Sequence, residues 1–219
     1  MKTILISGVG RGLGRALVQE YLDLGWRVVG ISRSFENFKL TSRNENFIAL
    51  ECDVRNFDDL SSKLTQINFH IDVIVVNAAK YVKKSFFLMS EEEIDCIIDT
   101  NLKGAMYLIY LTANRLRVGG KIIFVNSVAG ISPIPNETVY AASKSALRMF
   151  AEIISAELKT RGIFVTSIFP GGINTEMQID TPNRDKLLDL SQVIQIINNI
   201  VNSEFIIKEV TFFSEIEFF

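Results

Sequence analysis

The sequence is poor in the residues that build metal centres and disulfide frameworks. It holds one histidine, His70, and two cysteines, Cys52 and Cys96, among 219 residues. A zinc site needs several thiolate or imidazole ligands at close spacing, and the sequence contains no such cluster. The cysteines fall at a predicted strand end and on a predicted helix, which favours buried, reduced thiols and a cytoplasmic protein. We therefore predict no metal site and no structural disulfide.

Long apolar runs and an excess of charge of one sign are also missing. No hydrophobic run approaches the ~20 residues that a membrane-spanning helix needs. The net charge is −2, with acidic and basic residues interspersed along the chain. These features argue against a membrane partner and against a nucleic-acid partner. The first predicted strand begins at residue 2 or 3, so we expect no signal peptide.

Hydrophobic residues, in contrast, are abundant. They make up 48% of the chain, which is high for a soluble monomer and predicts that part of the surface is covered at a subunit interface. The length suits one domain with a substantial core. No linker, repeat or low-complexity tract interrupts the chain, so we expect residues 1–219 to form a single domain.

The N-terminal region has the pattern of a dinucleotide-binding βαβ unit. A short apolar run, residues 3–7, leads into the segment Gly8-Val9-Gly10-Arg11-Gly12-Leu13-Gly14. A stretch with apolar residues at helical spacing follows over residues 15–24, then Gly25 and a second apolar run at residues 27–32. Glycines let the backbone approach a pyrophosphate, and the helix N-terminus offers free N–H groups to it. The segment therefore predicts a dinucleotide site.

Apolar strands and amphipathic helices alternate along the rest of the chain. Further strands are predicted at residues 47–52, 71–76, 121–127, 164–169 and 209–213. The clearest helices are predicted at residues 91–116, 138–161 and 187–201, the first with a Ser90/Glu93 capping box. The alternation predicts an α/β fold with one Rossmann-like, doubly wound parallel sheet of about seven strands and helices on both faces.

The most informative feature is the segment Tyr140-Ala141-Ala142-Ser143-Lys144, with Ser127 upstream. Residues four apart share one face of a helix, so the phenol and the ammonium can reach the same small volume. A free tyrosine has a pKa of about 10, and a nearby positive charge lowers it. We expect Lys144 together with an oxidised nicotinamide ring to supply that charge, and Ser127 to donate a hydrogen bond to a developing oxyanion. A Tyr-x-x-x-Lys pair alone also occurs in ordinary helices, and only the rest of the chain favours the catalytic interpretation.

With both motifs present, the chain resembles the classical short-chain dehydrogenase/reductase family. The glycine motif Thr-Gly-x-x-x-Gly-x-Gly appears with Ser7 in place of threonine, and the family's Asn-Asn-Ala-Gly segment appears as Val76-Asn77-Ala78-Ala79, with two of its four positions different. The remaining landmarks follow in the family's order as Asn101, the segment Asn126–Gly130 around Ser127, the Tyr140/Lys144 pair, and Pro170-Gly171 followed by Ile173 and Thr175. The resemblance runs from Lys2 to about Thr175 with every landmark in order, and continues more loosely to the end of the sequence.

The resemblance implies a role for each matching residue. Ser127, Tyr140 and Lys144 would be catalytic, and Asn101 would hold a water in a proton relay to the lysine. The cofactor would contact Gly8, Arg11, Gly12, Leu13, Gly14, Ser32, Arg33, Asp53, Val54, Asn77, Ala78, Ala79, Tyr140, Lys144, Pro170, Gly171, Ile173 and Thr175. The family is commonly dimeric or tetrameric, so a homodimer or homotetramer is expected.

The end of the second strand indicates which nicotinamide cofactor is used. NAD-binding units place an acidic residue about 20 residues past the glycines, where it binds the adenine ribose. Here Ser32 and Arg33 occupy that place. Arginine suits a 2′-phosphate, and Arg11 could approach the same phosphate from the other side. We therefore predict NADP(H) over NAD(H).

The substrate does not follow from the sequence. The segment after residue 175, which holds the substrate lid in the family, looks shortened, and a helical stretch begins at Leu187. A short lid suits a carrier-bound carbonyl or alcohol substrate and a small-molecule one equally. The aromatic tail with Phe212, Phe213, Phe218 and Phe219 is expected to form a last strand and an interface patch.

Two alternatives to an NADP(H)-dependent oxidoreductase remain open. One is a non-catalytic NADP(H)-binding sensor, against which the joint presence of Ser127, Tyr140, Lys144 and Asn101 argues. The other is a methyltransferase-like Rossmann protein, which would want an acidic residue after the second strand.

Overall fold

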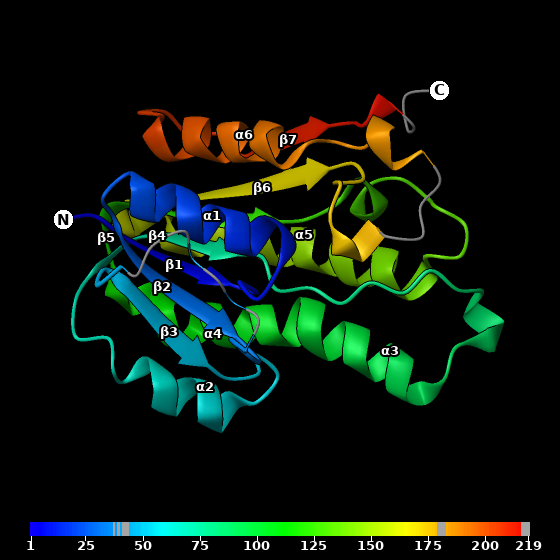
Figure 1. Ribbon diagram of the computed structural model, residues 1–219, viewed down its shortest axis with the longest axis horizontal. Coiled ribbons are helices and arrows are strands. Elements are labelled where there is room, and N and C mark those ends of the chain that lie inside the picture. The colour runs from blue at the N-terminus through cyan, green and yellow to red at the C-terminus, as the bar shows by residue number, and fades with distance from the viewer. Residues whose placement is uncertain (37, 39, 41–43, 179–182, 216–219) are drawn as a thin grey trace.

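A computed structural model describes residues 1–36, 38, 40, 44–178 and 183–215. In this part of the chain the sheet has seven strands in the order β3-β2-β1-β4-β5-β6-β7, and every pairing is parallel. The strands are β1 (Thr3–Ser7), β2 (Arg27–Ser32), β3 (Phe47–Glu51), β4 (Ile71–Val76), β5 (Leu116–Val125), β6 (Phe164–Pro170) and β7 (Glu209–Phe212). The predicted fold class is confirmed (Figure 1).

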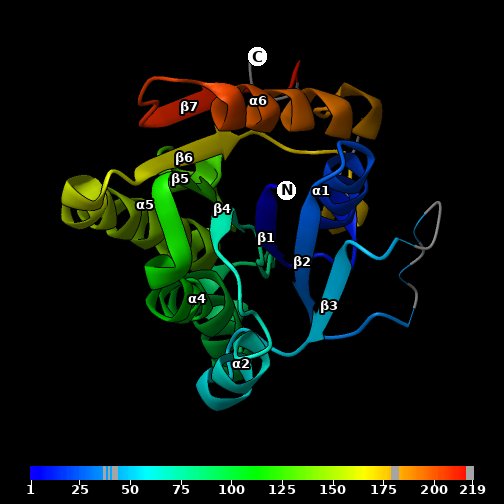
Figure 2. The same cartoon turned by 90° about the vertical axis from the view of Figure 1, so that its left-hand side faces the viewer.

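Helices cover both faces of this sheet. They are α1 (Gly12–Asp23), α2 (Phe57–Leu64), α3 (Glu91–Ile98), α4 (Gly104–Thr112), α5 (Thr138–Leu158) and α6 (Leu190–Asn202). Figure 2 shows α1 and α6 on one side and α2, α4 and α5 on the other. Two buried apolar clusters follow from this layering, one with Leu60, Leu108 and Leu147 and one with Leu17 and Ile197. Strands buried on both faces need apolar residues at nearly every position, which is what their sequences show.

The ends of α1 and α3 form as their sequences predict. Gly25 has a φ of +75°, in the left-handed region that a helix C-terminus often requires. At the start of α3, the Ser90 hydroxyl accepts from the Glu93 backbone N–H, and the Glu93 carboxylate accepts from the Ser90 N–H. The two ends are therefore satisfied locally, before any tertiary contact.

The helix predicted over residues 91–116 is corrected by the structure. It consists of α3, a π-helical turn over Asp99–Lys103, and α4, which ends at Thr112. Leu116 already belongs to β5, so that strand begins before the predicted Lys121. The register between β4 and β5 shifts just after Leu116, where Gly119 has a φ of +80°. The apolar periodicity of this segment shows neither the π turn nor the early strand start.

The strand order reverses between β1 and β4. Strand β1 pairs with β2 on one side and with β4 on the other. The helix α1 after β1 and the helix α4 after β4 lie on opposite faces of the sheet (Figure 2). In open α/β sheets this switch point leaves a crevice at the carboxyl ends of the strands, where ligands bind. No helix in the described residues is long and apolar enough to cross a membrane.

Candidate active site

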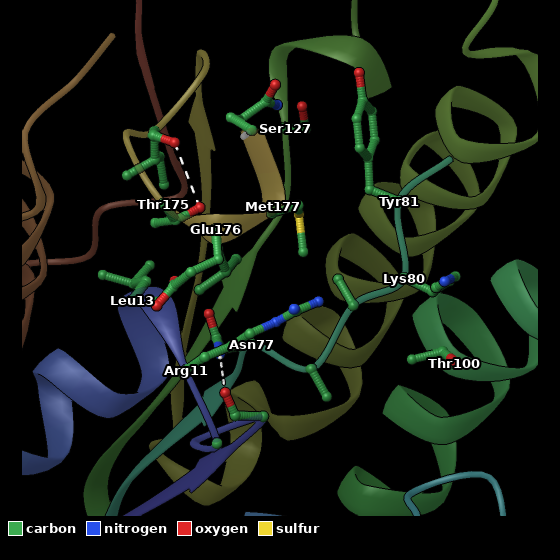
Figure 3. Close-up of a pocket in the computed structure, with 18 of the residues that line it drawn as sticks. Arg11, Leu13, Asn77, Lys80, Tyr81, Thr100, Ser127, Thr175, Glu176 and Met177 are labelled. Atoms are coloured by element: carbon green, nitrogen blue, oxygen red, sulfur yellow. Dashed lines mark hydrogen bonds between the residues drawn. The ribbon is translucent and has the colours of Figure 1, made fainter. Parts of the chain in front are cut away.

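A cleft of about 790 Å³ lies at the carboxyl ends of the strands. It is lined by segments that follow β1, β2, β3, β4, β5 and β6 in turn. Figure 3 shows Leu13 on one side of it, Ser127 and Tyr81 at the top of the view, and Arg11 and Asn77 together in the lower part. All predicted cofactor and catalytic residues line this cleft except Gly14 and Asn101. The fold thus brings together residues that are far apart in the sequence.

The glycine-rich turn forms the floor of the cleft. Gly8 has a φ of +74°, and a Cβ added there would lie 2.7 Å from the Ala78 Cα. A Cβ on Gly14 would overlap the carbonyl oxygen of Gly8. Gly14 therefore acts by letting α1 pack closely on the end of β1, where a side chain would push the helix away from the strand.

The N-terminus of α1 opens into the same cradle. Arg11 is its N-cap, and within the described residues no side chain caps the helix there. The first N–H groups of an uncapped helix and its positive dipole end are suited to a phosphate. The glycine turn and this helix start therefore fit the pyrophosphate of a dinucleotide.

A serine hydroxyl joins the ends of β1 and β4 beneath the cleft. Ser7 Oγ accepts from the backbone N–H of Asn77 at 3.0 Å and of Ala78 at 3.1 Å. The Asn77 amide in turn donates to the carbonyl oxygens of Ser7 at 2.9 Å and Gly8 at 3.1 Å. A threonine, the residue of the family motif at this position, would also supply this hydroxyl. The substitution to Ser7 therefore keeps the group that joins the two strand ends.

The end of the cleft beside β2 and β3 is rich in arginine. Ser32, Arg33, Asp53 and Arg11 line it, and both Arg11 and Arg33 are exposed. Burial alone would raise the pKa of Asp53, but hydrogen bonds from Arg55 outweigh it and lower the pKa, and the charge of Arg33 lowers it further. The Asp53 carboxylate is held by the Arg55 guanidinium, with a shortest distance of 2.7 Å. Arg33 therefore lies near a carboxylate that is already paired.

The other end of the cleft brings together Ser127, Tyr140 and Lys144. Lys144 is 2% exposed, its Nζ donates to the carbonyl oxygen of Val125 at 2.8 Å, and it lies 5.8 Å from the centre of the Tyr140 ring. Ser127 follows β5 and lines the cleft with Tyr140, and the effect of its hydroxyl on the phenol is to lower the pKa of Tyr140. The phenol, the hydroxyl and the ammonium therefore face one volume.

Burial has the largest effect on the pKa values of Tyr140 and Lys144. Burial raises the pKa of Tyr140 to about 12, and the negative charge of Glu137 adds to this increase. The Ser127 hydroxyl has the opposite, smaller effect on the pKa. Burial also lowers the pKa of Lys144 from 10.5 to about 8. The lysine by itself therefore does not lower the pKa of the tyrosine, because desolvation of the phenolate is the larger effect.

Asn101 lies behind the cleft and outside its lining. Its side chain accepts from the Lys80 N–H at 2.7 Å and donates to the Lys80 carbonyl oxygen at 3.0 Å and to Ser143 Oγ at 2.9 Å. The π turn directs this amide inward, where it is 1% exposed. Asn101 thus ties the segment after β4 to α5, next to Lys144.

Several residues that line the cleft were not identified from the sequence. They include Arg15, Lys80, Tyr81, Cys96, Thr100, Ile134, Glu137, Glu176, Met177 and Gln178. Glu137 lies one helical turn before Tyr140, a spacing that could have indicated it. Tyr81 and Glu176 belong to no sequence motif, and only the fold places them at the cleft. Cys52 is buried and Cys96 half-buried, both as free thiols.

The predicted shortened lid is described only in part. Glu176–Gln178 and Arg184–Lys186 each form a 3₁₀ turn, and α6 begins at Leu190. Residues 179–182, including Pro182, lie outside the described residues, as do Phe218 and Phe219 of the predicted aromatic tail.

The lowered pKa of Lys144 predicts a pH-dependent stability. Between the folded pKa of about 8 and the ordinary 10.5, the unfolded chain binds more protons at this residue than the folded chain. The free energy of unfolding should therefore rise with pH in this window. A Lys144→Met variant lacks this titration. The free energy of unfolding of the wild type, relative to that of the variant, should therefore increase by roughly 2–3 kcal/mol between pH ~8 and ~10. Urea unfolding of both proteins at several pH values measures this difference, and a flat difference would contradict the lowered pKa.

The fold and the cleft at its switch point define a Rossmann-like α/β protein. A family model described as short chain dehydrogenase matches residues 2–186. Carbonyl reductase family member 4 of Danio rerio is 32% identical over 180 residues, which cover 79% of this chain and 76% of that protein. The chain belongs to the short-chain dehydrogenase family, a family of oxidoreductases, and the resemblance found in the sequence is confirmed.

Solved structures agree with the fold. 4-Hydroxyisoleucine dehydrogenase complexed with NADH is similar with a TM-score of 0.84 and 23% identity, over 98% of this chain and 97% of that chain. ElxO with NADP bound is similar with a TM-score of 0.85 and 23% identity, over 97% of each chain. Family membership excludes the methyltransferase-like alternative.

Proposed function

We propose that this protein is an NADP(H)-dependent oxidoreductase that transfers hydride between the nicotinamide and a carbonyl or secondary alcohol. The observation that carries the proposal is the meeting of Ser127, Tyr140 and Lys144 at one end of a cleft whose other end fits a dinucleotide. When bound, the cofactor supplies or accepts the hydride.

In the reductive direction, the chain's residues bind the substrate oxygen and protonate it. The Ser127 hydroxyl donates a hydrogen bond to the carbonyl oxygen as negative charge develops there. Tyr140 donates its phenolic proton to the same oxygen. Its pKa of about 12 keeps the phenol protonated at neutral pH, which is the form that a proton donor needs. Lys144 stabilises the phenolate that remains, and Asn101 supports the resupply of the proton.

The remaining site residues would hold the cofactor. Lys144 would also bind the nicotinamide ribose, and Ile173 and Thr175, which line the cleft, would hold the carboxamide. Arg11 and Arg33 would meet a 2′-phosphate at the adenosine end, where an exposed guanidinium can form paired charge-assisted hydrogen bonds. NADPH preference in turn favours reduction as the physiological direction.

We further propose that the protein is a cytoplasmic homodimer or homotetramer. Two free thiols suit a reducing compartment. Tyr110 on α4 and Met149 and Ile153 on α5 are at least half exposed, and such apolar surface suits a subunit interface. The partners of the site are small-molecule or carrier-bound carbonyl or alcohol substrates.

Cofactor titration followed by turnover tests the proposal. Purified protein is titrated with NADPH and NADH by fluorescence, and NADPH oxidation is then followed against a panel of aldehydes and ketones. We expect tighter binding of NADPH and measurable turnover. Tight NADPH binding without turnover on the whole panel would favour the non-catalytic sensor, and absence of binding by either nucleotide would refute the proposal.

A further inference from the structure

Residues 171–178, which follow β6, lead from the end of that strand to the start of α1. A Cβ added to Gly12 would lie 3.4 Å from Thr175 and 3.7 Å from a carboxylate oxygen of Glu176. Glu176 also pairs with Arg15 on α1, at 3.4 Å between Oε1 and Nη2. Thr175 and Glu176 therefore form the wall of the cleft beside the glycine turn (Figure 3).

A second segment, residues 183–189, anchors the first one. The Leu188 N–H donates to the Gly172 carbonyl oxygen at 2.9 Å, and the Asn174 N–H donates to the Leu188 carbonyl oxygen at 2.9 Å. Ile173 and Leu188 thereby form a parallel β-bridge. Leu188 is buried in the apolar cluster on the α1 side of the sheet. The backbone up to Asn174 is therefore tied to the core of the fold.

Arg184 extends this anchorage to Thr175. Its Nη2 donates to Asn174 Oδ1 at 2.7 Å and to the Thr175 carbonyl oxygen at 3.2 Å. A guanidinium forms stronger hydrogen bonds than a neutral donor, and its planar fork fixes their direction. Among the described residues, the buried Nε of Arg184 has no hydrogen-bond partner, and Arg184 does not line the cleft. Arg184 therefore acts on the wall of the cleft from outside, through the backbone of Thr175.

We propose that Arg184 is a positioning residue for the nicotinamide half of the cofactor. By holding Asn174 and Thr175, it keeps the segment that would bind the carboxamide in its binding geometry. A segment that is already ordered loses less conformational freedom on binding, so the cofactor binds more tightly without any further contact. The inference rests on the proposed oxidoreductase function, in which Ile173 and Thr175 hold the carboxamide. The adenosine half would lie at the end of the cleft beside β2 and β3 and should not depend on Arg184.

Two ligands that differ in the nicotinamide half test the proposal. NADPH contains this half, whereas 2′,5′-ADP carries only the adenosine half with its 2′-phosphate. Arg184→Met removes the guanidinium and keeps an apolar stem. We expect the Kd for NADPH, measured by fluorescence titration, to rise at least about tenfold in this variant, because charge-assisted hydrogen bonds are lost. The Kd for 2′,5′-ADP, measured by calorimetry, should stay within about twofold, because its site is distant from the substitution.

Further variants sharpen the comparison. Arg184→Lys keeps the charge without the planar fork, so it should recover part of the affinity for NADPH. Asn174→Ala removes the nearer acceptor of Arg184 and should also weaken NADPH binding. The double variant should bind NADPH no more weakly than Arg184→Met alone, because the bond between the two side chains is already lost. Lys186→Met removes an exposed positive charge from the same 3₁₀ turn and should change neither Kd.

The outcomes separate this inference from the proposed function. If wild type and Arg184→Met bind NADPH equally well, the inference is overturned and the oxidoreductase stays intact. A Kd for 2′,5′-ADP that rises by the same factor as that for NADPH would also overturn the inference, since Arg184 would then support the fold as a whole. If Arg184→Met does not fold, Asn174→Ala takes its place in the same comparison. If the wild type binds NADH alone, NADH and AMP replace the two ligands. Absence of binding by any of these nucleotides would refute the proposed function, and the inference with it.

Discussion

Replacing Tyr140 with phenylalanine should lower kcat for NADPH-dependent carbonyl reduction by roughly 10³-fold and leave the Kd for NADPH within a few-fold. The phenolic oxygen is the only atom lost. The ring keeps its edge-on contact with Tyr81, and Lys144 keeps its bond to the Val125 carbonyl oxygen. The substrate oxygen would then lack its proton donor while the cofactor site is preserved. Stopped-flow turnover and a fluorescence titration with NADPH measure the two quantities.

Tyr21→Phe is the matched control for this change. Tyr21 is 1% exposed in the apolar cluster on the α1 side, and in the described part of the chain its hydroxyl has no hydrogen-bond partner. Removing it should leave kcat unchanged and should not destabilise the fold. Activity of Tyr140→Phe within tenfold of the wild type would show that another group donates the proton.

Changing Ser32 to aspartate and Arg33 to alanine together should shift the ratio of NADPH to NADH affinity by roughly 10²–10⁴-fold toward NADH. The new carboxylate at position 32 repels a 2′-phosphate and can accept hydrogen bonds from the ribose hydroxyls of NADH. The loss of Arg33 removes a charge-assisted contact to the phosphate. Each of the two substitutions should change the binding free energy by on the order of 1.5–3 kcal/mol. Ser32 lies at the end of β2 against the glycine turn, where an added Cβ on Gly10 would lie 2.7 Å from its Oγ. Titration of both nucleotides measures the ratio.

Arg15→Ala controls for a general loss of positive charge. Arg15 also lines the cleft, but it pairs with Glu176 at 3.4 Å. Its removal should leave the nucleotide preference within about threefold, since an exposed ion pair contributes little. A double variant at Ser32 and Arg33 that still prefers NADPH would refute the assignment of the 2′-phosphate to this end of the cleft.

The sequence alone predicted the fold and most of the cleft because both depend on local chemistry. Parallel strands covered on both faces require apolar runs, and a close approach of α1 to β1 requires glycine at positions such as Gly8 and Gly14. The capping box at Ser90 and the glycine end at Gly25 are satisfied by neighbours in the chain. Such features can be read without knowing what lies across the fold.

The tertiary structure decided what depends on contacts between distant segments. The π turn at Asn101 forms where its amide can bond Lys80 and Ser143, and neither partner is local to it. The pKa of Tyr140 rises because the folded protein removes the phenol from water, an effect that the Tyr-x-x-x-Lys spacing cannot show. Tyr81, from the segment after β4, meets the Glu137 carboxylate beside the cleft, a contact between segments 56 residues apart. Motifs thus determined which residues form the site, whereas burial and long-range packing determined their charge and their neighbours.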